Sequence, residues 1–232
     1  MNTIIVRADQ NNPDSESVML GASIIREGGT VIFPTETVYG LGADGLNESA
    51  CMKIFVAKNR PADNPLILHI SSLEMLERVA FLDDDDLRSK ILSFWPGPLT
   101  VLLRKRPSVP DAVSAGLPTV AVRMPDNPLA LALIDSSGVP IAAPSANLST
   151  RPSITDSADA ISEMYGRVDL IYDTGHTAFG IESTIVDMTA NPPKLLRSGS
   201  TTVEDLEAVF GHIEVTEAAR GTMESLGREW IQ

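Results

Sequence analysis

Several features that are common in proteins of 232 residues are scarce in this sequence, and each scarcity excludes a class of structure or function. Cys51 is the single cysteine, so the chain cannot form an internal disulfide, which fits a reducing cytoplasm. Basic side chains are few: 18 lysine and arginine residues face 31 aspartate and glutamate residues, and the net charge is −13. Such a field repels nucleic-acid backbones at long range. Aromatic residues make up 5% of the chain, which weighs against a base-stacking surface.

Motifs for several kinds of site are also missing. No apolar run reaches the roughly 18 residues that suggest a membrane span. No glycine is followed by lysine, so there is no P-loop. The three histidines, His69, His176 and His212, lack the spacing of metal ligands, and we expect no metal held by the protein itself. The segment Met1–Arg7 is typical of an edge strand rather than a secretion signal, so we expect a cytoplasmic protein.

Apolar runs alternate with helical patterns, which predicts an α/β fold with one sheet covered by helices. The expected strands are Thr30–Phe33, Leu66–Ile70, Leu99–Leu103, Thr119–Arg123, Val139–Ala143, Asp169–Tyr172 and Ser183–Met188. The expected helices are Ser15–Glu27, Asn47–Ala57, Asp83 onward, Leu129–Ile134, Asp156–Tyr165 and Val203–Phe210, with a further one capped by Ser71 and Glu74. We expect a single domain at residues 1–211 and a short C-terminal tail at 212–232.

The glycines of Gly40–Gly45 match the dinucleotide-binding pattern G-x-G-x-x-G, but this signal is weak on its own. The next predicted strand ends in His69-Ile70 rather than in the acidic residue that a nicotinamide site needs. We therefore expect these glycines to form a tight turn.

Four polar clusters lie where predicted strands end or turns begin, the places where open α/β sheets bind ligands. Lys58 and Arg60 bring cationic groups that bind phosphate, while Ser145 and Asn147 offer small hydroxyl and amide groups for directed hydrogen bonds. The four clusters are Pro34–Gly40; Lys58–Pro65 with His69; Thr119 with Arg123; and Pro144–Asn147 with Ser153, joined by Glu182–Thr184 and Leu196–Gly199. Their co-occurrence favours one shared site for a phosphate-rich ligand.

Each cluster also has a purely structural interpretation. Lys58 and Arg60 could form a solvated helix C-terminus, and Ser145 with Asn147 could only shape a turn. His69 could be a satisfied core histidine. Arg123 ends an apolar strand and needs a partner, which could be the carboxylate of Glu36 or that of Glu182.

Several ordered motifs closely resemble the YrdC-like family of L-threonylcarbamoyladenylate synthases. They are GGTVIFPTETVYGLG, KNRP followed by NPL, FWPGPLT, TVAVRMP, AAPSAN and ESTIVD, and they extend from about Gly28 to Gly199. The resemblance implies a YrdC-like domain: a twisted, mostly mixed sheet with helices on its faces, enclosing a basic cavity.

The resemblance also implies a nucleotidyltransferase activity. Such an enzyme condenses L-threonine, bicarbonate or carbon dioxide, and ATP to threonylcarbamoyl-AMP and pyrophosphate, with Mg²⁺ accompanying ATP. A downstream transfer complex then modifies adenosine 37 of tRNA, so tRNA is met only indirectly, and neither DNA nor membrane is an expected partner.

Carried over residue by residue, the resemblance assigns L-threonine binding to Thr37, His69, Arg123, Ala143 and Ser183. It assigns ATP binding to Lys58, Arg60, Asn64, Thr119, Ser145, Asn147, Ser153 and Arg197. Lys58 and Arg60 are the expected catalytic cations, because they would stabilise phosphoryl charge.

Two alternatives stay open at this point. The chain could be an RNA-binding module of the same fold. It could also be a carbamoyl-transfer domain acting on another acceptor, as in hydrogenase maturation proteins, although their zinc-finger cysteines are absent here. Longer relatives carry a linker and a second C-terminal domain, whereas this sequence stops at Gln232, so it is either a single-domain form or part of a longer chain.

Overall fold

A computed structural model describes residues 2–221 of the chain. Its strands are β1 (Ile4–Arg7), β2 (Val31–Pro34), β3 (Tyr39–Asp44), β4 (Ile67–His69), β5 (Ala80–Phe81), β6 (Leu99–Lys105), β7 (Thr119–Arg123), β8 (Ile141–Ala142), β9 (Leu170–Asp173), β10 (Thr184–Asp187), β11 (Lys194–Arg197) and β12 (Glu214–Val215). Its helices include α1 (Ser15–Arg26), α2 (Glu48–Lys58), α3 (Leu73–Val79), α4 (Asp85–Leu92), α5 (Asp111–Ser114), α6 (Pro128–Ser137), α7 (Ser157–Met164) and α8 (Val203–Phe210).

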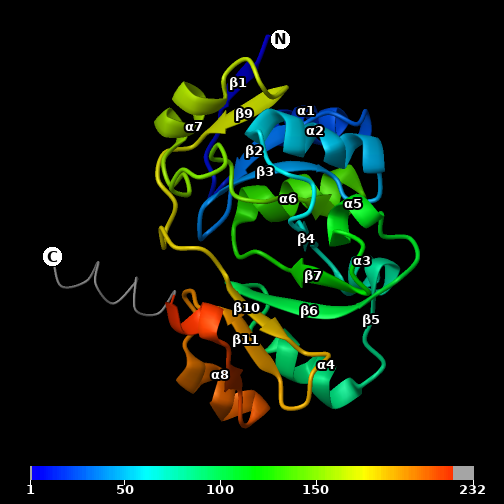
Figure 1. Cartoon of the computed structure of the whole chain (residues 1–232). Coiled ribbons are helices and arrows are strands. Elements are labelled where there is room, and N and C mark those ends of the chain that lie inside the picture. Colours follow the sequence, from blue (N-terminus) through cyan, green and yellow to red (C-terminus); the bar gives the residue numbers. More distant parts are fainter. Residues whose placement is uncertain (1, 222–232) are drawn as a thin grey trace, which may run out of the picture.

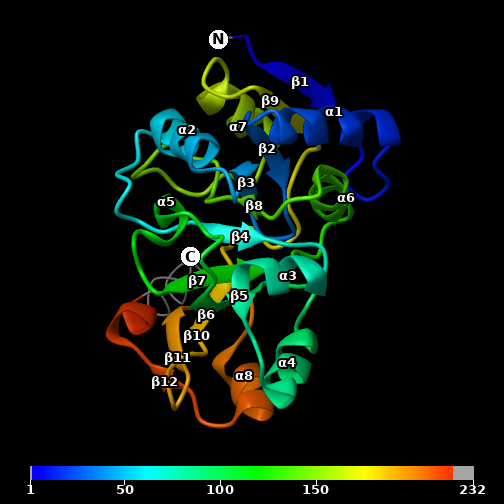
Figure 2. The same ribbon diagram turned by 90° about the vertical axis from the view of Figure 1, so that its right-hand side faces the viewer.

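The strands form one mixed sheet in the order β1-β9-β2-β3-β8-β4-β7-β6-β10-β11-β12, with β5 attached to β6. Parallel pairs such as β4 with β7 alternate with antiparallel pairs such as β6 with β7. The sheet runs the length of the molecule, with β1 and β12 at opposite ends (Figures 1 and 2). The prediction of an α/β fold with a mixed sheet is therefore confirmed.

Apart from α5, which follows Pro110, helices α1 to α8 begin where polar side chains cap their first backbone N–H groups. Asn47 accepts from the N–H of Ala50 to begin α2, and Asn127 accepts from the N–H of Ala130 to begin α6. Helix α1 packs against α6, and α2 packs against β3. Together they bury strand residues such as Phe33, which is fully inaccessible to solvent. The apolar core thus lies between sheet and helices and fixes the strand ends that carry polar residues.

Most of the glycine-rich segment is a strand and not the expected turn, and only Gly45 lies in the turn that follows. Residues 39–44 form β3, which pairs with β2 and β8, and neither Gly40 nor Gly42 has a positive φ. A Cβ on Gly42 would lie 2.6 Å from Cγ2 of Ile141 and 2.7 Å from Cε1 of Phe33. Glycine is needed here because neighbouring side chains approach the backbone closely.

Among the other differences, β5, β11, β12 and α5 have no counterpart in the expected elements, and the remaining ones are small. Helix α3 is capped by Ser72 rather than Ser71, and β8 covers only Ile141–Ala142 of the expected strand. The first part of the expected tail packs onto the fold, since β12 pairs with β11 and Ile213 is 2% exposed. The rest of that tail, from residue 222, lies outside the described residues. Within residues 2–221, no helix has the length and apolarity to cross a bilayer.

Candidate active site

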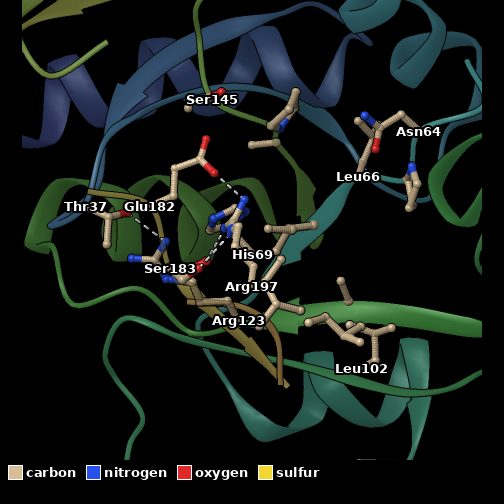
Figure 3. A pocket seen from close by; sticks show the side chains of 18 of the residues that line it. Thr37, Asn64, Leu66, His69, Leu102, Arg123, Ser145, Glu182, Ser183 and Arg197 are labelled. Atoms are coloured by element: carbon tan, nitrogen blue, oxygen red, sulfur yellow. Dashed lines mark hydrogen bonds and ion pairs between the residues drawn. The ribbon is translucent and has the colours of Figure 1, made fainter. Parts of the chain in front are cut away.

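A cavity of about 420 Å³ opens beside the central strands, and most of the predicted site residues line it. His69 and Arg123 stand side by side at the ends of β4 and β7, where the register of the two parallel strands pairs them. The predicted residues in the wall are Thr37, Arg60, Asn64, His69, Thr119, Arg123, Ala143, Ser145, Ser183 and Arg197. Figure 3 shows that their side chains converge from several strands and loops. The four polar clusters of the sequence therefore do share one cavity.

Arg123 is held on every side of its guanidinium group. Its Nε donates to the carbonyl of Gly97 at 3.2 Å, and its Nη1 donates to Oγ1 of Thr37 at 3.0 Å. Its Nη2 lies 2.5 Å from Oε1 of Glu36 in an ion pair whose members are 3% and 6% exposed. Burial lowers the pKa of Arg123, and the charge of Glu36 works against that shift. Of the two carboxylates proposed as its partner, Glu36 is the one that pairs with it.

His69 is a buried, neutral imidazole. Its side chain is 4% exposed, and its Nδ1 has no hydrogen-bond partner among the described residues. Burial, followed by the positive charge of Arg123, lowers the pKa of His69 to about 3. The ring meets Phe33 edge-on at 6.1 Å between centroids. His69 thus forms part of the cavity wall, while its Nδ1 is buried and unpaired among the described residues.

Arg197 is oriented by Ser183 and Glu182. Its Nε donates to the carbonyl of Ser183 at 2.9 Å, its Nη2 donates to Oγ of Ser183 at 3.0 Å, and its Nη1 pairs with Oε2 of Glu182. Ser153, which does not line the cavity, donates to Oε1 of Glu182 at 2.7 Å. Arg60 is held more loosely, with Nη2 donating to the carbonyls of Asn64 and Pro65 at 3.3 and 3.2 Å.

Lys58 and Asn147 lie outside the cavity wall. Lys58 is 1% exposed, and its Nζ donates to the carbonyls of Ser145 and, at 2.5 Å, Asn147. The Nδ2 of Asn147 donates in turn to the carbonyls of Leu148 and Arg151. Burial and the nearby charge of Arg60 lower the pKa of Lys58 to about 8. Lys58 therefore fastens the end of α2 to the loop that carries Ser145 into the cavity.

Sequence reasoning placed Glu182 in a polar cluster but assigned it no role in binding. It lines the cavity, together with apolar residues to which sequence reasoning assigned no role in the site: Leu66, Leu102, Leu117, Ile185 and Leu196. The signal for Glu182 was available, because it directly precedes Ser183 and is a lone acid among predicted cations. The apolar residues gave no such signal, since Leu66, Leu102 and Ile185 resemble ordinary buried strand positions and Leu117 and Leu196 lie outside the expected strands. No group of three or more potential metal-ligating side chains occurs within residues 2–221.

Comparison with known proteins supplies the family. The Sua5/YciO/YrdC family model, described as "Telomere recombination", matches residues 23–199. This chain belongs to that family. Its resemblance to YrdC-like proteins, inferred from the motifs, is thereby confirmed. The matched region contains every residue that the resemblance assigned to the site.

Two curated relatives of this family member are threonylcarbamoyl-AMP synthases. The one from Pyrococcus abyssi is 48% identical over 94% of this chain and 64% of its own length. The one from Bacillus subtilis is 47% identical over 89% of this chain and 60% of its own length. The chain thus spans less than two thirds of these relatives. The crystal structure of P. abyssi Sua5 complexed with L-threonine superimposes with a TM-score of 0.91 at 47% identity, covering 94% of this chain and 63% of that one.

Proposed function

We propose that this family member catalyses the formation of L-threonylcarbamoyl-AMP and pyrophosphate from L-threonine, bicarbonate or carbon dioxide, and ATP. The observation that carries this proposal is one cavity whose wall contains residues assigned to L-threonine and most of those assigned to ATP. The relatives' synthase activity and the threonine complex of P. abyssi Sua5 support the same substrates here. In a cell, the product would pass to a transfer complex that modifies adenosine 37 of tRNA in the cytoplasm.

The threonine end of the site would be the wall formed by Arg123, Thr37, His69 and Ser183, together with Ala143. Arg123 has five N–H groups, and those not engaged by Gly97, Thr37 and Glu36 remain for the amino-acid carboxylate. The small hydroxyl groups of Thr37 and Ser183 would hydrogen-bond the hydroxyl of threonine, and the neutral ring of His69 would shape the pocket around it. An analogue without that hydroxyl would leave those buried groups unpaired, so the site would reject it.

The nucleotide end would lie between Arg60, Asn64 and Thr119 on one side and Ser145 and Arg197 on the other. The two arginines would offset triphosphate charge, and the apolar residues Leu102, Leu117 and Ile185 offer a surface for the base. Mg²⁺ would arrive as part of the ATP complex, since Mg²⁺ binds mainly through phosphate oxygens and water, with one or two carboxylates. Glu182 is the one carboxylate among the described residues of the wall.

The chemistry needs no nucleophilic side chain. The threonine amine would add to carbon dioxide and lose a proton, which gives an N-carboxylate. An oxygen of that carboxylate would form a bond to the α-phosphorus of ATP, while the bond from that phosphorus to the bridging oxygen breaks and pyrophosphate leaves. Positioning of the reactants and stabilisation of phosphoryl charge by Arg60 and Arg197 would lower the barrier, and Lys58 would act through the Ser145 loop.

The decisive experiment measures pyrophosphate release from ATP without RNA. We expect release only when both threonine and bicarbonate are present. Arg60→Gln should abolish most of it, whereas Arg88→Gln, an arginine of α4 outside the cavity, should leave it unchanged. Release without threonine would contradict the proposal, as would tight RNA binding without turnover.

A further inference from the structure

Glu182 places a negative charge in a cavity that is proposed to bind the negatively charged triphosphate of ATP. It is the one acidic side chain among the described residues of the wall, which also contains Arg60, Arg123 and Arg197. A carboxylate at this position repels phosphate, so the fold must gain something else from it.

The contacts of Glu182 are with groups expected to bind ATP. Its Oε2 pairs with Nη1 of Arg197, and its Oε1 accepts from Oγ of Ser153 at 2.7 Å. Figure 3 shows the carboxylate of Glu182 directed toward the guanidinium group of Arg197. Its negative charge also raises the pKa values of Lys58, Arg60 and Arg197 against the effect of their burial. The carboxylate therefore contacts Arg197 directly and also acts electrostatically on Arg60 and on Lys58 behind the wall.

Glu36 gives an informative contrast. Glu36 pairs with Arg123 from behind the wall and is 6% exposed, so its charge is fixed there. Glu182 pairs with Arg197 from inside the cavity, with 34% of its side chain exposed. A buried ion pair is costly to break, but a pair that faces open space can exchange one anion for another. Only Glu182, of these two, can give way to a ligand.

We propose that the carboxylate of Glu182 takes the place of a phosphate group before ATP binds, by pairing with Arg197 and accepting a hydrogen bond from Ser153. The phosphates of ATP displace it when they enter the cavity. The carboxylate returns to these partners as pyrophosphate leaves. This inference rests on the proposed function for the identity of the ligand. It makes Glu182 a specificity-determining residue, because a weakly charged ligand gains too little from Arg197 to displace the carboxylate. Because the same competition weakens the hold on pyrophosphate, it favours product release.

The test is calorimetric titration of the full chain with inorganic pyrophosphate and with MgATP. Glu182→Gln keeps the shape and an acceptor oxygen but removes the charge. We expect this variant to bind pyrophosphate about tenfold more tightly than the unaltered protein, as when one competing charge-assisted bond is lost. Turnover should become slower and show an initial burst, since pyrophosphate would leave more slowly. Glu77→Gln, which removes a carboxylate paired with Arg88 outside the cavity, should change neither value.

Several outcomes would overturn the inference. Unchanged pyrophosphate affinity in a folded Glu182→Gln variant would mean that the ion pair is structural only. Weaker MgATP binding would assign the carboxylate to the cation instead. If Glu182→Gln does not fold, Glu182→Asp, which draws the charge back from Arg197, must tighten pyrophosphate binding in the same direction. Failure of the unaltered protein to bind either ligand would instead contradict the proposed function.

Discussion

At the scale of single residues, the positive charge of Arg123 in the cavity wall is neutralised by Glu36, which lies behind the wall. Arg123 could serve a substrate carboxylate only because Glu36 compensates its charge from behind, where both side chains are almost inaccessible to water. Neither carboxylate oxygen of Glu36 has a hydrogen-bond partner among the described residues, so its burial relies on the ion pair. Function and stability are therefore coupled at Arg123.

We predict that Arg123→Met destabilises the protein by about 3–5 kcal/mol, because it leaves a buried carboxylate without its partner. Adding Glu36→Gln should recover part of that loss. Urea unfolding of the two single variants and the double variant measures the coupling. Strictly additive effects would show that the pair contributes no interaction energy in the folded state.

His69 makes stability depend on pH with a definite sign. The folded imidazole, with a pKa of about 3, stays neutral while the unfolded one, near 6.5, takes up a proton as the pH falls. The contribution of neutral, buried His69 to the free energy of unfolding should therefore be complete above about pH 6.5 and should be lost progressively as the pH falls toward 3. Urea titrations of His69→Gln should show a shallower decrease than the unaltered protein. His212→Gln, at an exposed position, serves as control and should keep the original slope.

At the scale of elements, β3 carries the close packing beneath the cavity. Gly42 has neighbours within 2.7 Å of where a Cβ would stand, whereas the nearest neighbour at Gly40 is at an ordinary 3.4 Å. We predict that Gly42→Ala lowers the free energy of unfolding by about 1–3 kcal/mol through overpacking. Gly40→Ala should cost much less, and thermal unfolding compares the two directly. Equal losses would mean that strand flexibility, and not contact, governs both positions.

Helix α2 acts on the site through the loop that follows β8. Removing the ammonium group in Lys58→Met would leave the carbonyls of Ser145 and Asn147 without a donor, at a cost of about 1–3 kcal/mol. We expect ATP affinity to decrease as well, since Ser145 lines the cavity. Lys53→Met, on the same helix but bonded to the carbonyl of Gly28, should alter stability alone. Normal ATP binding by Lys58→Met would refute this indirect role.

At the scale of the whole molecule, the sequence predicts the class of fold better than it predicts which strands pair with one another in the sheet. Strand β7 and helix α8 begin and end where their patterns place them, because apolar period and capping residues are local signals. The sequence does not predict β3, because its glycines leave no alternation of apolar and polar side chains. It does not predict β11 either, because so short a strand is recognised only from its pairing with β10. The order that inserts β10 between β6 and β11 has no local signal at all.

The candidate site shows the same limit. Motifs identified the residues of the wall, but two acidic residues were equally plausible partners for Arg123, and only tertiary packing selected Glu36. The burial of Lys58 was equally invisible, because a lysine at the end of a helix normally reaches solvent. Contacts between distant segments therefore determine the partner of Arg123 and the burial of Lys58, which local sequence patterns do not reveal.

The walls of the cavity come from remote stretches of chain: Thr37 beside β3, Arg123 on β7 and Arg197 on β11. A nascent polypeptide cannot assemble this set until its last contributor has been synthesised and β11 has paired with β10. A molecule that prefers the finished cavity shifts the folding equilibrium by mass action. Folding of the polypeptide and binding of a ligand in the cavity are thus thermodynamically linked, so the concentration of such a ligand would help to set how much intact protein persists.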